Sequence, residues 1–221
     1  MKRAAAYFSS SIGKKQIMGL TGLGLCGFVL THMIGNLLYL KGPDAYNGYS
    51  LALTSNHLIY VAEGGLIAMF VLHVLFAIWV SAENRAARPI GYAKAPKKKG
   101  AADLSSKTML LSGLVVLAFV VLHLITFKFG PEYPYTIHGE EGRDLHKLMT
   151  EVFLQPLYTA WYVLAISILG LHLSHALWSS LQTLGLVGLG KEKKVRLLSY
   201  AFGVVIVVGF LVNPIYIYVK G

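Results

Sequence analysis

Five long apolar segments constrain the fold of this chain most strongly, and four of them carry a histidine deep inside. A helix needs about 20 apolar residues to cross a bilayer. The segments that reach this length lie at 16–40, 57–82, 107–128, 156–184 and 195–217. Only 14% of the 221 residues are charged, which is too few for a soluble domain of this size. We therefore predict an all-α fold, a polytopic bundle of five transmembrane helices that forms a single domain over residues 1–221.

The four histidines are His32, His73, His123 and His172, in the contexts FVLTHMIG, VLHVLFAI, VVLHLITF and LGLHLSHALWSS. Because an ionisable side chain inside a membrane is costly, each of them marks a functional site by default. A hydrogen-bonded structural histidine is the simpler interpretation of any single one. Four histidines on four helices favour pairs, however, and facing pairs inside a helix bundle are the ligands that two bis-imidazole haems require.

The depth of each histidine in the membrane predicts its partner. At a rise of 1.5 Å per residue, His32 and His123 both lie about 24 Å from the cytoplasmic ends of their segments. His73 lies about 14 Å deep and His172 about 18 Å. We therefore expect one pair between the first and third helices, toward the outer face, and another between the second and fourth helices, toward the cytoplasmic face. His175, at about 14 Å, fits the second pair equally well, so spacing alone leaves this ligand open.

The distribution of Lys and Arg predicts the orientation. Fifteen of the 20 lie in the N-terminal segment and in the second and fourth connections. The other five are Lys41, Lys128, Arg143, Lys147 and Lys220. The positive-inside rule then places the N-terminus in the cytoplasm. The net charge of +10 accordingly comes from basic residues gathered on the cytoplasmic side, where they attract membrane lipid. It does not indicate a nucleic-acid-binding surface.

Two features of the first apolar segment bear on cofactor binding. Its cysteine, Cys26, is the single cysteine of the chain, so an internal disulfide, an iron–sulfur cluster and a CxxCH haem attachment are excluded. Any haem is therefore a non-covalently bound b type. The glycines Gly19, Gly22, Gly24 and Gly27 leave one side of the helix bare, which favours close helix packing, room for a flat macrocycle, or both. The segment is too long for a signal peptide, and we expect a retained helix.

The connections and the last segment are expected to be simple. Turn residues at Gly42-Pro43-Asp44 and Asn47-Gly48 predict turns between the first two helices. The longest outer connection is most simply a solvated surface, with its charged residues Glu140, Glu141, Arg143, His146 and Lys147 in water. The fifth helix carries no histidine, is expected to seal the bundle, and is predicted to end near Asn213-Pro214.

The chain resembles the single-subunit, di-haem cytochrome b anchors of succinate dehydrogenase and fumarate reductase, the b558-type group. The resemblance covers essentially the whole chain: five helices, a cytoplasmic N-terminus and a histidine in each of the first four. The segment HLSHALWS is similar to the HxSxxLWS stretch of that family, whose first histidine ligates haem. On that basis His172 is the ligand, and His175 is a neighbour. The chain departs from some members at Gly170, where they carry a glutamate linked to proton movement.

The resemblance implies a haem-containing, quinone-reactive subunit of a succinate:quinone oxidoreductase in the bacterial cytoplasmic membrane. His32 and His123 would ligate the outer haem b, and His73 and His172 the inner haem b. Electrons would pass between a quinone and two cytoplasmic subunits, a flavoprotein and an iron–sulfur protein. Menaquinone is favoured over ubiquinone as the quinone. This chain carries no dinucleotide fingerprint and no dicarboxylate site, so it performs no dicarboxylate chemistry alone. Arg85, Arg88 and Lys97 to Lys99 are the first candidates for docking the iron–sulfur subunit.

Two other functions are considered. A di-haem cytochrome b of a hydrogenase or formate dehydrogenase would share the histidines but not the HLSHALWS context. A haem-free transporter with a histidine proton relay would be colourless and is expected to have internal repeats. The sequence contains no convincing repeat, which disfavours the transporter.

Glu63 is the candidate catalytic residue for quinone. It lies about 9 Å inside the outer end of the second helix, where a carboxylate is costly unless it is neutral, paired or hydrated. Quinone chemistry needs a group that exchanges protons with the ring oxygens, and Gly64 and Gly65 leave space beside Glu63. Asn56, His57 and Tyr60 are expected to complete a polar pocket at this place. The rival interpretations are a structural hydrogen bond of Glu63 and an inner quinone site near Gln16.

Overall fold

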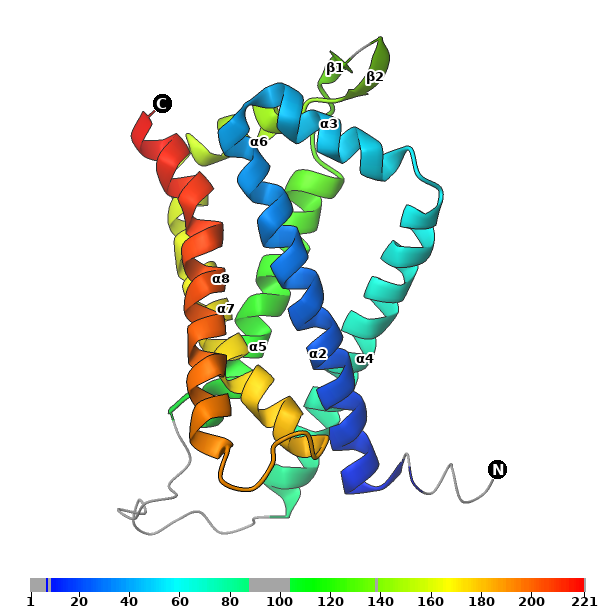
Figure 1. Cartoon of the computed structure of the whole chain (residues 1–221), viewed down its shortest axis with the longest axis vertical. Helices are drawn as coiled ribbons and strands as arrows, with labels where there is room; N and C mark the ends of the chain where they lie inside the picture. The colour runs from blue at the N-terminus through cyan, green and yellow to red at the C-terminus, as the bar shows by residue number, and fades with distance from the viewer. Residues whose placement is uncertain (1–6, 8, 88–103, 138, 221) are drawn as a thin grey trace.

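The computed structural model describes residues 7, 9–87, 104–137 and 139–220. For residues 104–107 it describes the backbone alone. Five helical segments are long and apolar enough to cross a membrane, as predicted. They lie side by side as an elongated bundle (Figure 1). The all-α expectation is confirmed, with one short β-hairpin as the exception.

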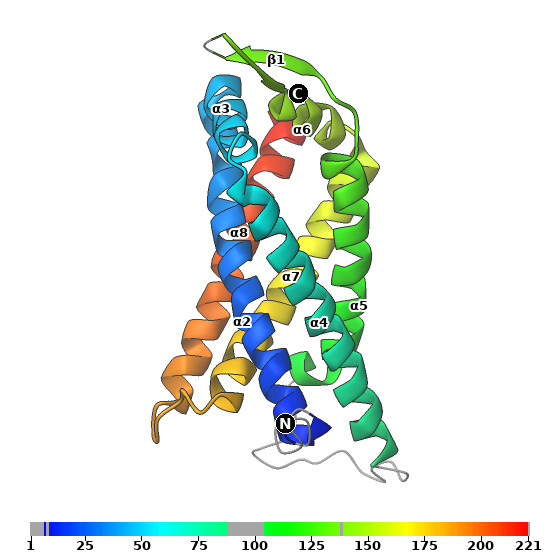
Figure 2. The ribbon, with the colours of Figure 1, turned by 90° about the vertical axis from the view of Figure 1, so that its right-hand side faces the viewer.

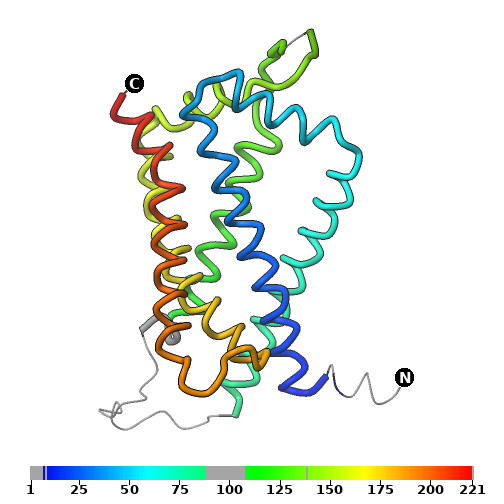
Figure 3. The backbone as a smooth tube through the Cα atoms, viewed as in Figure 1, coloured from blue at the N-terminus to red at the C-terminus, as the bar shows by residue number. Residues whose placement is uncertain are grey.

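The elements follow one another in a simple order. They are α2 (Ser11–Asn36), η1 (Leu37–Lys41), α3 (Pro43–Thr54), α4 (Leu58–Ala86), α5 (Leu104–His123), η2 (Leu124–Lys128), β1 (Pro134–Ile137), β2 (Glu140–Arg143), α6 (Leu145–Phe153), α7 (Pro156–Thr183) and α8 (Glu192–Lys220). Figure 3 traces the chain from the start of α2 at one end of the bundle to the end of α8 at the other. We name these the N-terminal end and the capped end.

α7 is the central helix and packs against α8, α5 and α2. Small residues allow the closest approach. A Cβ added at Gly203 of α8 would lie 2.6 Å from the carbonyl oxygen of Gly170 on α7, so the two backbones nearly touch. Gly170 therefore faces α8, and a glutamate at this position would collide with Val207.

α4 lies at the edge of the bundle. Among its described residues only Val80 is buried. It packs against the N-terminal half of α2 and diverges from that helix toward the capped end (Figure 1). Its large apolar side chains, such as Leu58, Val61 and Ile67, are exposed, as expected for a helix that faces lipid.

The capped end is more structured than the sequence predicted. The connection expected to form turns contains the helix α3, and the connection expected to be a solvated surface contains the antiparallel hairpin β1–β2 and the helix α6. All of these lie at the same end of the bundle (Figure 2). The charged residues of this stretch favour a solvated surface, but α6 also carries an apolar stripe, and Leu148, Met149, Val152 and Phe153 on that stripe are buried.

One buried amide joins the two helices of the cap. Asn47 of α3 is 1% exposed, and its Nδ2 donates to Oδ1 of Asp144 at 2.8 Å. Its Oδ1 accepts from the backbone N–H of His146 at 3.0 Å. Asp144 also caps α6 by accepting from the backbone N–H of Lys147 at 2.9 Å. These bonds fix α6 over the ends of the membrane helices.

The prediction that the fifth helix ends near Asn213-Pro214 is wrong, because α8 continues to Lys220. Proline removes one backbone donor from a helix, and within a membrane bundle neighbouring helices can compensate for the loss. Here α8 is tied to α2 beside the proline: Nδ2 of Asn213 donates to the carbonyl oxygen of Asn36 at 2.6 Å. Pro214 thus lies inside α8, next to a residue that binds α2.

Candidate functional site

The structure brings the four predicted histidines together in two groups. His32 of α2 and His123 of α5 form the group nearer the capped end, with ring centroids 5.8 Å apart and ring planes at 89°. Two imidazoles that share one metal, each with a nitrogen about 2 Å from it, have centroids about 6 Å apart. The His32–His123 spacing is thus close to that of a shared axial pair.

The second group lies nearer the N-terminal end. His73 of α4 and His172 of α7 are close enough to interact electrostatically, and His175 is also within that range of His172. His73 and His172 thus lie within electrostatic range of each other across the bundle. The pairing of the second and fourth membrane helices stays a prediction.

Each of three rings has its Nδ1 bound to a residue of another helix. Nδ1 of His73 lies 3.1 Å from the carbonyl oxygen of Met18, and Nδ1 of His172 lies 3.0 Å from Oγ of Ser112. Nδ1 of His123 lies 3.2 Å from the hydroxyl of Tyr162. Metal-bound histidines typically use their second nitrogen in this way.

Two of these bonds fix the tautomer of the ring. The Met18 oxygen can only accept, so Nδ1 of His73 carries the proton. The Ser112 hydroxyl donates to the carbonyl oxygen of Met109 at 3.0 Å, so it accepts from Nδ1 of His172. In the neutral rings of His73 and His172, Nε2 therefore keeps its lone pair, which is the form that binds a metal.

Aromatic side chains surround the first pair. Phe28 stacks on His32, with centroids 5.2 Å apart. Phe119 and Phe127 lie 5.8 and 5.3 Å from the centroid of His123. All four histidines are nevertheless only partly buried.

The glycines of α2 were expected to allow close helix packing or to leave room for a macrocycle, and they differ in what surrounds them. Gly19 backs onto Ser180 of α7, which is close helix packing. A Cβ at Gly22 would lie 3.2 Å from Cε1 of His73, so this glycine makes room for the imidazole. Gly27 has no atom within 4 Å of such a Cβ and leaves open space.

Glu63 is not alone near the capped end of α4. Its carboxylate forms an ion pair with Nζ of Lys128, and the two side chains are 37% and 47% exposed. Lys128 ends the π-helix η2, which directly follows His123. A π-turn inserts an extra residue and rotates the residues after it, and such turns are frequent at functional sites. Lys128 is the partner of Glu63 that the sequence did not reveal.

None of the described hydrogen bonds or ion pairs joins Glu63 to Asn56, His57 or Tyr60, the residues of the predicted polar pocket. Oδ1 of Asn56 accepts from the backbone N–H of Leu58 at 3.0 Å and so helps to start α4. Tyr60 is 67% exposed. Gly64 and Gly65 have open space where a side chain would be, in agreement with the expected room beside the carboxylate.

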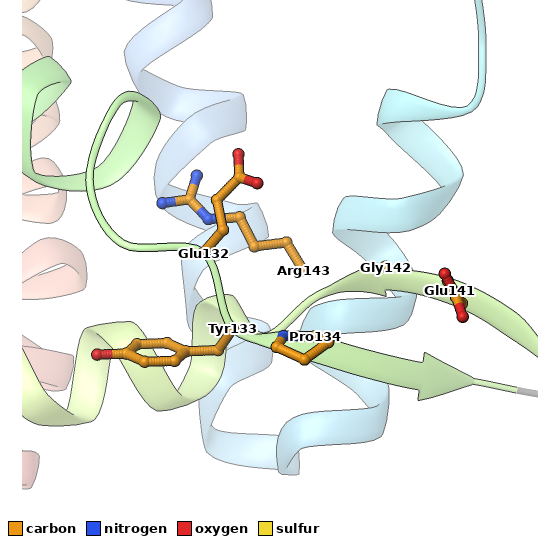
Figure 4. Close-up of a pocket in the computed structure, with 6 residues that line it drawn as sticks. All are labelled: Glu132, Tyr133, Pro134, Glu141, Gly142 and Arg143. Carbon is orange, nitrogen blue, oxygen red and sulfur yellow. The ribbon is translucent and has the colours of Figure 1, made fainter.

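The hairpin holds the chain segment that carries Lys128. The guanidinium of Arg143 donates to four backbone carbonyl oxygens, at 2.8 Å to Phe127, 3.3 Å to Lys128, 3.1 Å to Gly130 and 2.8 Å to Pro131. A shallow pocket forms here, in which Arg143 lies beside Glu132 while Tyr133 points away (Figure 4). Because its donors are already used, Arg143 acts as a clamp on the end of η2 and not as a free anion site.

The N-terminal end contains a second ion pair. The buried Lys14 of α2 pairs with Glu83 of α4, and its Nζ lies 4.0 Å from the ring centroid of Trp79. Gln16, the rival quinone position, accepts a hydrogen bond from Tyr7. Of the docking candidates, Arg85 lies in the last turn of α4. Arg88 and Lys97 to Lys99 lie outside the described residues.

The described residues contain no group of three or more His, Cys, Asp or Glu side chains that could hold a bare metal ion. Each pair of histidines supplies two ligands, so a metal between them must bring its remaining ligands with it, as the iron of haem does. The residues present therefore fit a bis-histidine haem. Comparisons of the chain with protein-family models, curated proteins and solved structures find no match.

Proposed function

We propose that this protein is the di-haem b membrane anchor of a succinate dehydrogenase or fumarate reductase, and that it passes electrons between an iron–sulfur subunit and membrane quinone. The observation that carries the proposal is the grouping of the four intramembrane histidines into His32 with His123 and His73 with His172. Bound haem supplies one-electron transfer, and a histidine on each side of the iron disfavours oxygen binding.

The residues around the histidines have distinct roles in this proposal. Met18 and Ser112 hold the protons of His73 and His172 on Nδ1 and so orient both rings. Tyr162 orients His123 from α7. Phe28 and Phe127 exclude water from the first pair. We assign His172 as the ligand on α7 and His175 as its neighbour.

Glu63 is the proposed proton-exchanging residue of a quinone site at the capped end. Its pairing with Lys128 gives the carboxylate a partner, and a carboxylate can exchange a proton with a quinone oxygen. The open space at Gly64 and Gly65 supports access from the lipid side. Menaquinone remains the favoured quinone in this proposal.

The orientation and partners follow from charge. With the N-terminal end in the cytoplasm, the basic residues of that end face the flavoprotein and iron–sulfur subunits. Lys191, Lys193, Lys194 and Arg196, at the start of α8, lie on this side as well. The bacterial cytoplasmic membrane is the proposed location.

A reduced-minus-oxidised absorption spectrum of the purified chain tests the proposal directly. Two b haems per chain are expected, and a colourless protein would favour the proton-relay transporter instead. Identification of the co-purifying subunits separates the complex proposed here from a hydrogenase or formate dehydrogenase, which would bring different catalytic subunits.

A further inference from the structure

Asn36 lies one helical turn after His32 and touches it twice. Its Nδ2 donates to the carbonyl oxygen of His32 at 2.8 Å and lies 3.3 Å from Nε2 of the same residue. Its Oδ1 accepts from the hydroxyl of Tyr46 at 3.0 Å. His32 is thus the one histidine of the four whose Nε2, and not its Nδ1, has a described protein partner.

The orientation of the Asn36 amide is set by its partners. The His32 carbonyl oxygen can only accept, so the NH2 group of Asn36 must face it. The second N–H of that group then points at Nε2 of His32, which has to accept. In the neutral ring the proton is therefore on Nδ1, and Nε2 has its lone pair, as in His73 and His172.

Two other elements hold Asn36 in place. Tyr46 belongs to α3, is buried, and donates to the amide oxygen. Asn213 belongs to α8, is 3% exposed, and donates to the backbone oxygen of Asn36. Among the described residues Oδ1 of Asn213 has no partner, so the bond to Asn36 is the one described bond of this buried amide.

We infer that Asn36 is a positioning residue for the capped-end metal site: its amide keeps Nε2 of His32 unprotonated, and it yields that contact when iron takes the lone pair. This inference rests on the proposed haem function. When the contact is exchanged, Asn36 keeps its bonds to the His32 carbonyl oxygen and to Tyr46. The exchange therefore costs one long hydrogen bond and leaves the support of the ring intact.

Two substitutions separate this role from simple packing. Asn36→Leu removes the donor but fills the space, so the proton of His32 is no longer held on Nδ1 and we expect both tautomers of the ring in the haem-free protein. Asn36→Asp keeps the shape and the acceptor for Tyr46 but presents a carboxylate to Nε2. The carboxylate draws the proton onto Nε2, so we expect haem binding at the capped-end site to weaken about tenfold or more, although the change is nearly isosteric.

The measurement uses the full chain in two states. In the haem-free protein, nitrogen NMR of the histidine rings reports which nitrogen of His32 is protonated: Nδ1 is expected in the parent and Nε2 in Asn36→Asp. In the loaded protein, low-temperature electron paramagnetic resonance reports the orientation of the axial rings. Both substitutions should change the signal of the capped-end haem and leave that of the other haem unchanged.

Asn47 provides the matched control. It is an equally buried amide at the same end, but its partners are Asp144 and the backbone of His146. Asn47→Leu should disturb the cap without changing the His32 tautomer. If Asn36→Asp leaves the proton on Nδ1, or if Asn47→Leu shifts the haem signal as much as Asn36→Leu does, the inference is overturned. A parent chain that binds no haem but has the expected tautomer would refute the proposed function alone.

Discussion

The imidazole planes of His32 and His123 stand at 89° to each other, with their centroids 5.8 Å apart. These residues are 91 positions apart in the chain and come from helices α2 and α5. Near-perpendicular axial rings interact about equally with the two iron orbitals that point between the porphyrin nitrogens. A bis-histidine haem at this position should therefore give a strongly anisotropic low-spin signal in electron paramagnetic resonance.

Replacing His123 with leucine should remove the capped-end haem and leave the second haem in place. The physical reason is that each pair would, in the proposed function, supply both axial ligands of one iron, and a single imidazole holds a b-type haem poorly. The spectrum of the reduced protein should lose about half its haem absorption, together with the anisotropic signal. A His123→Leu protein that keeps both haems would contradict the pairing.

His175→Ala should be milder than His172→Ala, and the reverse result would mean that His175 is the ligand.

Ser112→Ala should weaken the haem near the N-terminal end. The substitution removes the acceptor for Nδ1 of His172, so the ring loses its fixed tautomer and orientation. Loss of such an outer partner typically lowers metal affinity about 10- to 100-fold. Haem titration of the purified apoprotein, followed at two sites, measures this effect. Ser174→Ala is a suitable control, because that hydroxyl bonds within its own helix to the Gly170 oxygen.

Glu63→Gln should reduce quinone turnover about 100-fold while both haems and the assembly stay intact. Glutamine keeps the shape and the hydrogen-bonding capacity but cannot exchange a proton, and general acid–base catalysis contributes at least about this factor. Steady-state quinone turnover of the whole complex is the measurement. Normal turnover would exclude the catalytic role, and loss of haem or subunits would favour a structural role for Glu63.

Lys128→Met tests the partner of Glu63. A half-exposed ion pair contributes only about 0–1 kcal/mol to the free energy of unfolding, so the fold should survive. Turnover should fall, because Glu63 loses the ion-pair partner that holds its carboxylate in place. Glu83→Gln, at the other ion pair of α4, controls for the loosening of this helix. Equal effects of Lys128→Met and Glu83→Gln on turnover would indicate that both pairs only hold α4 in place.

The cap should become less stable as the pH falls below about 6.5, the ordinary pKa of histidine. His146 stacks on Tyr39, with centroids 4.1 Å apart and planes at 6°. Burial lowers the pKa of His146, while Asp144 and the backbone of Tyr39 act weakly in the opposite direction. The opened state therefore binds the proton more tightly, and the stability contributed by neutral His146 is present above about pH 6.5 and lost below it. Hydrogen exchange in α6 measures the opening, and His146→Phe should remove its pH dependence.

The five membrane spans and the positions of the four histidines within them could be predicted from the sequence alone. Hydropathy is a property of local composition, and depth follows from counting residues at a constant rise, so neither needs knowledge of neighbouring helices. The same counting places His32 level with His123 without any knowledge of their contact. Glu63 stood out for a similar reason, because a carboxylate in an apolar segment is conspicuous wherever its partner lies.

The side chains that complete these sites follow from the packing of the helices and not from the sequence. Membrane helices are apolar on nearly all sides, so their sequence carries little signal of how each helix is rotated. The contacts of Ser112 with His172 and of Tyr162 with His123 depend on that rotation. Lys128 reaches Glu63 at the end of a π-turn that no local pattern announced. Local composition thus set which residues lie at each depth, and the three-dimensional arrangement of the helices set which of them meet.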